Sequence, residues 1–400
     1  MSADSNRPLS GVRIVEMSSF VAVPLAGMTL AQLGAEVVRV DPLGGAADYR
    51  RWPLAPSGDS IYWAGLNKGK RAVAVDLRSP EGRQLVTRLV AEAGVLITNS
   101  TGRQWHSYPT LSEQRPDLIH LEVVGRADGS NAVDYTVNAA TGFPFITGPR
   151  DHVGPINHVL PAWDLICGLY AALSVVTALR RRDTTGQGSS IRLPLDDVAL
   201  TMASNLGFLT EAMVNGRQRP RLGNAVFGQY GLDFTTSDGV SFMVVALTPR
   251  HFEDLIELTG TGNAVAAIAE AFGADFADEG QRYEYHEILD ALFAGWFGNH
   301  TADEASAALS ASSVLWGRYQ NFAEVAESPR VTANPLFSEL AQPRIGTFLA
   351  PGLPMSVDGE HVAPAPAPRL GEHTADVLRD WLGADDAEIA SWLESGTAAT

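Results

Sequence analysis

The stretch that decides the fold is Gly11–Asp41, with the sequence GVRIVEMSSFVAVPLAGMTLAQLGAEVVRVD. It starts with an apolar, β-branched run, Gly11–Glu16, and ends with a second such run, Glu36–Asp41. Between them, Pro24 stands where a helix can begin, and apolar residues recur at helical spacing until Gly34. A strand, a helix and a strand in this order predict a βαβ unit with a right-handed crossover.

The same alternation continues downstream. Arg71–Leu77 has the composition of a strand, and Ser79 followed by Pro80 is typical of a helix start. Two more apolar runs, Val95–Ile97 and Leu118–Val124, predict further strands. We therefore expect an α/β fold, in which helices cover both faces of a mostly parallel, Rossmann-like sheet.

Composition suggests where the chain divides. We expect a large domain from residues 1–215 and 331–400, a linker at 216–231, and a smaller domain at 232–330. In the large domain we predict an apolar helix that begins at Asp164 and a second helix over 196–214. Near the end, residues 351–368 are proline-rich and predict an extended segment, after which Thr374 is typical of a helix cap.

Charge and cysteine content exclude several classes of protein. The 29 Lys and Arg against 46 Asp and Glu give a net charge of −17, which disfavours nucleic acids and anionic membrane surfaces as partners. Met17–Ala35 is uncharged, but Pro24 and Gly27 make it a poor membrane span. The single cysteine, Cys167, and the lack of an apolar signal segment in Met1–Ser10 predict a cytoplasmic protein.

Common catalytic motifs are absent from the sequence. No Gly-x-Gly-x-x-Gly follows the first strand, and there is no P-loop, no Gly-x-Ser-x-Gly and no His-Glu-x-x-His. The nine histidines lack the spacing of metal ligands. We therefore expect no metal site, and a nucleotide-dependent oxidoreductase is disfavoured.

One carboxylate, Asp164, lies between Trp163 and the predicted apolar helix. From these residues alone Asp164 is most simply a helix cap, because a carboxylate at a helix N-terminus accepts backbone N–H groups. The alternative is a nucleophile in a partly apolar site.

Five ordered segments favour the second interpretation. They are Pro8–Glu16, Ala31–Asp41, Leu66–Gly82, Thr185–Gly188 and Ala367–Thr374. Together they resemble the family III CoA-transferases, and the similarity extends from about Pro8 to the last helix. The resemblance implies a Rossmann-like large domain, a smaller α+β domain, and a homodimer whose two chains interlock.

The resemblance also implies site residues. Asp164 would be the nucleophile that attacks an acyl-CoA thioester and then carries CoA as an aspartyl-CoA thioester. Asp134 matches an acidic residue that orients the nucleophile, and it would need its own hydrogen-bond donors, because two close carboxylates raise the pKa of one of them. No cofactor would be bound permanently, since CoA is part of the substrate. The implied CoA contacts are Val75, Asp76, Leu77, Arg78, Asn99 and Asn131.

Two of these assignments stay open. Arg78 is equally well a solvated cation at a helix start. After Asn99 the family often has Phe-x-Pro-Gly, whereas this chain has Ser100–Gly102, so no further contact is assigned there.

Val133 separates two branches of the family. In α-methylacyl-CoA racemases a histidine directly precedes the residue matched by Asp134, and it works as part of an acid/base pair. An isopropyl group cannot transfer a proton, so racemisation is disfavoured. His152 and His158 could replace that histidine, but each is more simply a loop residue.

Further runs resemble the members that move CoA between the C1 and C4 carboxyl groups of mesaconyl-CoA. They are Asp48–Pro53, Trp63–Arg71, Val124–Gly129, Val133–Asn138 and Asn157–Asp164. The resemblance implies a small dicarboxylic acid as the acyl group and a cation for its free carboxylate, for which Arg50, Arg51 and Arg126 are equal candidates. The alternatives are CoA exchange between two separate acids, which the sparse glycines at Gly223–Gly231 argue against, and a non-catalytic CoA-binding protein.

Overall fold

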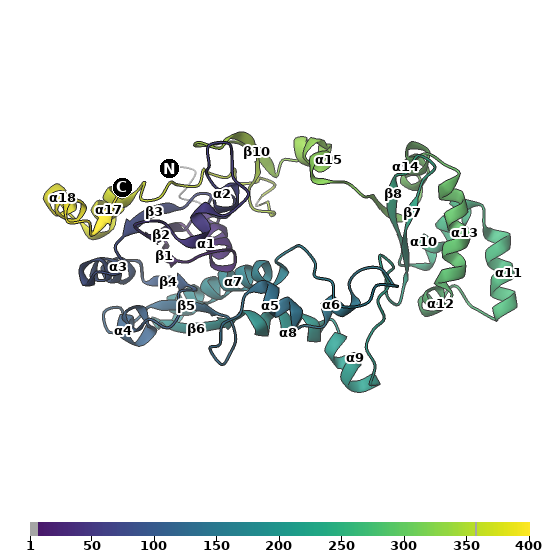
Figure 1. Cartoon of the computed structure of the whole chain (residues 1–400), viewed down its shortest axis with the longest axis horizontal. Coiled ribbons are helices and arrows are strands. Elements are labelled where there is room, and N and C mark those ends of the chain that lie inside the picture. The colour runs from purple at the N-terminus through teal and green to yellow at the C-terminus, as the bar shows by residue number, and fades with distance from the viewer. Residues whose placement is uncertain (1–6, 357) are drawn as a thin grey trace. The chain divides into compact units, whose positions relative to one another are not determined.

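The computed structural model describes residues 7–356 and 358–400 (Figure 1). By their contacts, the described residues divide into two units. The first unit lies within Met1–Thr141, Val159–Thr210 and Pro329–Thr400, and the second is Gly142–His158 with Glu211–Ser328.

The first unit is built on a seven-stranded sheet with the order β12-β3-β2-β1-β4-β5-β6. Every neighbouring pair is parallel except β12 with β3, which is antiparallel. This order and the helices between the strands confirm the predicted α/β fold. The strands are β1 (Arg13–Met17), β2 (Glu36–Pro42), β3 (Arg71–Val75), β4 (Val95–Thr98), β5 (Ile119–Val124), β6 (Ser189–Pro194) and β12 (Ala398–Ala399), and a separate hairpin pairs β10 (Phe337–Gln342) with β11 (Gly346–Pro351).

Helices cover both faces of this sheet (Figure 1). Buried side chains of α3, α17 and α18 form a core with β1, β2 and β3, while α1 and α7 pack together on the sheet. The helices of the first unit are α1 (Ala22–Gln32), η2 (Ala47–Arg50), α2 (Ile61–Leu66), α3 (Pro80–Ala93), η3 (Gln104–His106), α4 (Tyr108–Ser112), α5 (Asp134–Ala139), α7 (Ala162–Thr185), α8 (Leu195–Asn205), α16 (Pro329–Thr332), α17 (Thr374–Leu382) and α18 (Asp386–Glu394).

The close packing of α1 on α7 depends on a glycine. A Cβ at Gly168 would lie 2.7 Å from the carbonyl oxygen of Ala22, so the two backbones can approach only because Gly168 has no side chain. This contact sets the second turn of α7 against the N-terminal end of α1. Among the residues that the structure describes, α7 is also the one helix long and apolar enough to span a membrane. Its contacts with α1 and β5 are those of a helix in a protein core.

The second unit combines a three-stranded antiparallel sheet with helices around an aromatic core, as expected for the smaller α+β domain. Its core includes Tyr230, Phe242, Phe252, Phe293 and Phe297. The elements are α6 (Phe143–Ile146), β7 (Tyr230–Thr235), β8 (Ser241–Ala246), α10 (Pro249–Thr259), α11 (Gly262–Phe272), α12 (Glu279–Glu284), α13 (His286–Gly298), α14 (Ala302–Ser310), β9 (Leu315–Arg318) and α15 (Phe322–Glu327); α9 (Phe208–Asn215) begins in the first unit and ends in the second.

Some boundaries differ from those expected. Residues 142–158 group with the second unit because the Arg221 guanidinium donates hydrogen bonds to the carbonyl oxygens of His152 and Gly154. The helix predicted over 196–214 is two helices, which separate at Gly207 with a φ of 81°. The predicted cap, Thr374, instead donates from Oγ1 to Ala399 at 2.6 Å and so attaches α17 to the edge of the sheet.

Candidate active site

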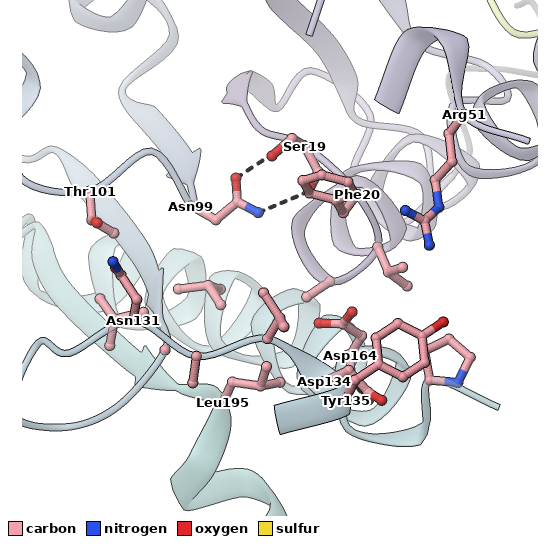
Figure 2. Close-up of a pocket in the computed structure, with 18 of the residues that line it drawn as sticks. Ser19, Phe20, Arg51, Asn99, Thr101, Asn131, Asp134, Tyr135, Asp164 and Leu195 are labelled. Atoms are coloured by element: carbon pink, nitrogen blue, oxygen red, sulfur yellow. Dashed lines mark hydrogen bonds between the residues drawn. The ribbon is translucent and has the colours of Figure 1, made fainter. Parts of the chain in front are cut away.

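A cavity of about 600 Å³ opens at the carboxyl edge of the sheet, where the strand order reverses between β1 and β4 (Figure 2). Loops that leave two adjacent parallel strands in opposite directions form a crevice at such a place, and ligands of open α/β sheets bind there. The loops after β1, β4 and β5 and the first residues of α5 and α7 form most of the wall, and further lining residues are Ala22, Arg51, Tyr62 and Leu195.

Asn99 joins two of these loops. Its side-chain oxygen accepts the backbone N–H of Ser19 at 3.1 Å, and its amide donates to the Ser19 carbonyl at 2.9 Å. Asn99 therefore fixes the loop after β1 to the end of β4. It also lines the cavity, as does Asn131, so these two of the predicted CoA contacts are brought together.

Asp164 is the third residue of α7 and lines the cavity as a half-buried side chain. Asp134, the first residue of α5, is almost completely buried, and its Oδ2 accepts the backbone N–H groups of Trp163 at 2.9 Å and of Asp164 at 3.1 Å. The first amides of α7 are thus satisfied by Asp134 from another helix. This finding corrects the capping interpretation of Asp164, whose carboxylate accepts no hydrogen bond from the described part of the chain.

The surroundings change the acidity of Asp164. The pKa of Asp164 is raised from 3.8 to about 7, because burial and then the nearby charge of Asp134 raise it more than Arg51 lowers it. A poorly solvated carboxylate that is ionised in part near neutral pH is a stronger nucleophile than one held by hydrogen bonds. Strongly shifted acids in a cavity are typical of catalytic sites.

The three arginines proposed for the substrate carboxylate lie in different places. Arg51 lines the cavity, whereas Arg50 is exposed and lies outside it. Arg126 is half-buried, donates to the Asn131 carbonyl at 3.1 Å, and has its Nε 4.0 Å from the Oδ2 of Asp196. Of the three, the structure brings only Arg51 to Asp164.

The predicted CoA contacts after β3 do not line the cavity. Val75 is buried and pairs with Ala398 of β12, and the backbone N–H of Asp76 donates to Thr397 at 2.8 Å. Leu77 and the exposed Arg78 follow at the same edge of the sheet, with β2 between them and the loop after β1. Contact of residues 75–78 with CoA stays a prediction.

Three aromatic residues of the cavity, Phe20, Tyr62 and Tyr135, were not found from the sequence. Phe20 has a positive φ of 65°, a conformation that is strained for a residue with a side chain. Its N–H donates to Oδ2 of Asp48 at 3.0 Å, and Arg39 holds both oxygens of Asp48 at 3.1 and 3.2 Å. The position of Phe20 in the loop after the first parallel strand is the one sequence signal that could have indicated it.

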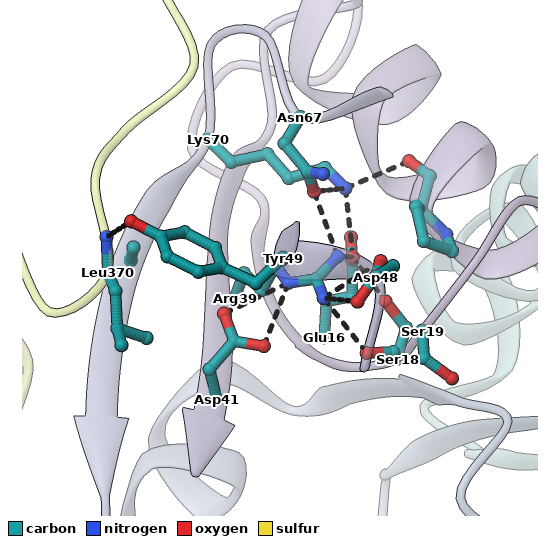
Figure 3. Close-up of polar contacts among 12 residues, drawn as sticks. Glu16, Ser18, Ser19, Arg39, Asp41, Asp48, Tyr49, Asn67, Lys70 and Leu370 are labelled. Atoms are coloured by element: carbon teal, nitrogen blue, oxygen red, sulfur yellow. Dashed lines mark hydrogen bonds and ion pairs between the residues drawn. The ribbon is translucent and has the colours of Figure 1, made fainter. Parts of the chain in front are cut away.

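A buried cluster of charged side chains supports this loop (Figure 3). Arg39 pairs with Asp41 through Nε, and its Nη1 donates to Asn67 at 3.1 Å. Lys70 donates to Oε1 of Glu16 and to Asn67, each at 2.8 Å. Burial lowers the pKa of Lys70 to about 8, although Glu16 acts in the opposite direction. The cluster therefore has nearly every charge matched by a partner.

Among the described residues, no group of three or more His, Cys, Asp or Glu side chains is placed to hold a metal ion.

Comparisons with known proteins identify the family. A model of CoA-transferase family III matches residues 9–374. A 2-methylfumaryl-CoA isomerase of Chloroflexus aurantiacus is 44% identical over 399 residues, which cover 98% of each chain. A succinate–glutarate CoA-transferase of Agrobacterium fabrum is 30% identical and covers 93% of this chain and 95% of its own.

Solved structures show the same fold. A protein of Brucella suis, described as a CAIB/BAIF family protein, superposes with a TM-score of 0.78 at 26% identity, and the match covers 94% of this chain and all of that chain. A Mycobacterium tuberculosis protein reaches a TM-score of 0.76 at 24% identity, over 92% of this chain and 98% of its own, and shows likeness of fold alone.

Proposed function

The chain belongs to CoA-transferase family III, and we propose that it moves CoA within one molecule, from the C1 to the C4 carboxyl group of mesaconyl-CoA (2-methylfumaryl-CoA). The observation that carries this proposal is Asp164, a half-buried carboxylate on the wall of the cavity whose pKa burial raises to about 7. The name of the relative that is 44% identical supports the choice of substrate.

The first half of the reaction transfers CoA to the protein. The Asp164 carboxylate attacks the C1 thioester carbonyl, and the carbon–sulfur bond breaks to give a mixed anhydride and the CoA thiolate. The thiolate then attacks the aspartyl carbonyl of the anhydride. This step forms an aspartyl-CoA thioester and releases the diacid with both of its carboxylates.

The second half returns CoA to the other end of the diacid. The C4 carboxylate attacks the aspartyl-CoA thioester, which expels the thiolate and forms a new mixed anhydride. Attack of the thiolate on the C4 carbonyl then gives the C4 ester and restores the Asp164 carboxylate. Every step exchanges one acyl bond for another, so the proposal requires no permanently bound cofactor.

The residues around Asp164 orient its side chain and keep water away from the reacting groups. Asp134 fixes the first turn of α7 through two backbone N–H groups, and this directs Asp164 into the cavity. Val21 and Val133 contribute apolar wall nearby. An apolar wall disfavours water, which would hydrolyse the anhydride or the thioester.

The two ends of the cavity differ in their chemistry. Figure 2 shows Thr101 and Asn131 together at one end and Asp164, Tyr135 and Arg51 at the other. Amide and hydroxyl groups suit the amides of the pantetheine arm of CoA. We therefore propose that the arm lies along Thr101 and Asn131, with the acyl group beyond Asp164.

We also propose a homodimer in the cytoplasm as the working form. The support within the first unit is an exposed apolar face on α7, to which Leu169, Tyr170, Leu173 and Val176 contribute. Exposed apolar patches of this kind are typical of protein interfaces. Light scattering at micromolar concentration should give the mass of two chains, and a monomer would contradict the proposal.

The experiment that tests the proposed reaction mixes unlabelled C1 ester with excess isotopically labelled free mesaconate. A diacid held beside aspartyl-CoA has an effective concentration on the order of 10⁵ M if well oriented, far above millimolar free acid. The C4 ester should therefore carry almost no label. Label at the solution ratio would instead indicate CoA exchange between separate acids, and no reaction with either C5 ester would refute the proposed substrate.

Hydroxylamine treatment and mass spectrometry test the intermediate. A CoA adduct that depends on substrate should appear on the peptide that contains Asp164 and disappear with hydroxylamine. Asp164→Asn should fold and form no adduct, because an amide is a poor nucleophile. Turnover by this variant without deamidation would refute the assignment.

A further inference from the structure

The charged residues that line the cavity are few. Among the described lining residues, Asp134 and Asp164 are the carboxylates and Arg51 is the cation. Asp134 is committed to the backbone of α7 by two hydrogen bonds. The charge that remains available to a ligand therefore lies on Asp164 and Arg51.

Two aromatic rings hold the Arg51 guanidinium. Its central carbon lies 4.9 Å from the ring centre of Tyr62 and 5.5 Å from that of Phe20. Among the described residues, the buried ion pairs beside this segment are made by Arg39 and Lys70 and not by Arg51. Stacking on rings uses the face of a guanidinium and leaves the N–H groups at its edge available. Those N–H groups match the two oxygens of a carboxylate.

Asp48 fixes the segment that carries Arg51. Asp48 lies in η2, three residues before Arg51, and accepts the N–H of Phe20 at 3.0 Å. The same carboxylate is held by Arg39 inside the buried cluster. Asp48 thus fixes the position of Arg51 and that of Phe20, on whose ring Arg51 stacks. The guanidinium is therefore held in place before any ligand binds.

Resting on the proposed function, we infer that Arg51 binds the free carboxylate of the acyl group and so makes the site specific for dicarboxylic over monocarboxylic CoA esters. Figure 2 shows Arg51 and Asp164 at the same end of the cavity. A thioester carbonyl at Asp164 therefore places the far end of a short acyl chain beside Arg51.

Arg51 has a second consequence in the middle of the reaction. When aspartyl-CoA forms, the diacid has two carboxylates and no covalent bond to the protein. The carboxylate that was on Arg51 must now reach Asp164, so the diacid turns end for end, and the newly released carboxylate takes its place on Arg51. The same cation thus retains the diacid during the turn.

The test compares two esters that differ only in the free carboxylate. One is the C1 ester of mesaconate, and the other is (E)-2-methylbut-2-enoyl-CoA, in which a methyl group replaces the C4 carboxylate. The rate of CoA adduct formation on Asp164 is measured for each ester with wild-type protein, Arg51→Gln, Arg51→Lys and Arg50→Gln. Arg50→Gln is the matched control, because Arg50 is adjacent in sequence but lies outside the cavity.

Arg51→Gln should slow adduct formation from both esters, because Arg51 no longer lowers the pKa of Asp164. It should slow the mesaconate ester roughly a hundredfold more than the methyl analogue, since only that ester also loses a desolvated charge-assisted pair. Arg51→Lys should recover part of the loss, because it keeps the charge without the planar fork. Arg50→Gln should keep both rates. Labelled free mesaconate should enter the product of Arg51→Gln more than that of the wild type.

Equal slowing of both esters by Arg51→Gln would overturn the inference, because Arg51 would then act on Asp164 or on folding. Thermal unfolding of each variant separates these last two causes. Wild-type protein that forms an adduct but does not prefer the mesaconate ester would overturn the inference and leave CoA transfer intact. Wild-type protein that forms no adduct from either ester would overturn the proposed function and this inference with it.

Discussion

Asp164→Asn should stabilise the fold while it abolishes turnover. The pKa of Asp164 is raised from 3.8 to about 7, first by burial and then by Asp134. The difference of 7 − 3.8, or about 3 units, corresponds to about 4 kcal/mol of lost stability once the group is ionised, at about 1.36 kcal/mol per unit. Water in the open cavity reduces this figure, so we expect a gain of about 2 kcal/mol for the amide at high pH.

The sign of the pH dependence follows from proton binding. Below about pH 4, Asp164 is protonated in both states and contributes nothing. Between about pH 4 and pH 7 the native protein keeps a proton that the unfolded chain loses, so stability falls as the pH rises. Above pH 7 the penalty is complete and constant. An asparagine has no such penalty, so the stability difference between the two proteins must widen from low to high pH.

Urea denaturation at pH 5, 6, 7 and 8.5 measures this difference directly. Asp128→Asn is the control, because Asp128 is an exposed carboxylate whose pKa is lowered, chiefly by its hydrogen bond with Ser130. Its effect on stability should not grow with pH. A constant or shrinking advantage of Asp164→Asn would refute the reasoning, as would a variant less stable than the wild type at pH 8.5.

Three further changes test other parts of the site. Asp134→Asn removes a charge that raises the pKa of Asp164. The acid limb of the pH–rate profile for adduct formation lies near pH 7 in the wild type and should move to lower pH in the variant. A shift to higher pH would contradict the assigned cause. Gly168→Ala should destabilise the fold by about 1–3 kcal/mol and slow adduct formation, because the new Cβ would collide with the carbonyl oxygen of Ala22. The control is Gly295→Ala, at a helical position with no neighbour within 4 Å. In urea denaturation it should be neutral or stabilising by up to about 1 kcal/mol. Lys70→Met removes the nearer of two cations from buried Glu16, leaves Arg39 at 3.7 Å, and should cost about 3–5 kcal/mol; a loss below about 1 kcal/mol would show that the Lys70–Glu16 pair contributes little to stability.

Much of the fold could be predicted because the relevant signals are local. Ser79 caps α3 through the N–H of Gly82 at 3.0 Å, and Gly94 ends that helix in the left-handed conformation, as residue preferences indicate. The two-residue strand β12 could not be predicted. It exists because α17 and α18 return the chain to β3, and no local pattern in Ala398–Ala399 records that pairing.

The candidate site was predictable only in part, for the same reason. Asp164 was indicated by its family resemblance, whereas the local pattern alone suggested a cap. Arg50 and Arg51 are indistinguishable by sequence, and it is the short turn of η2 that exposes one and directs the other into the cavity. Fully buried Arg39 also contradicts the usual preference of arginine for the surface.

The buried cluster is best understood through the loop that it supports. Replacing buried ion pairs with apolar side chains is often neutral or even stabilising by about 1–4 kcal/mol, so stability alone does not account for Arg39 and Asp48 in a core. Phe20 adds a strained backbone, which costs on the order of 1–2 kcal/mol. Both costs are offset by the position that these residues give to the site. Asp48 of η2, which Arg39 holds, accepts the Phe20 N–H and so fixes the loop after β1 to η2. Because Arg51 then has little freedom left to lose when a carboxylate arrives, binding energy can serve recognition of the diacid instead of ordering the site.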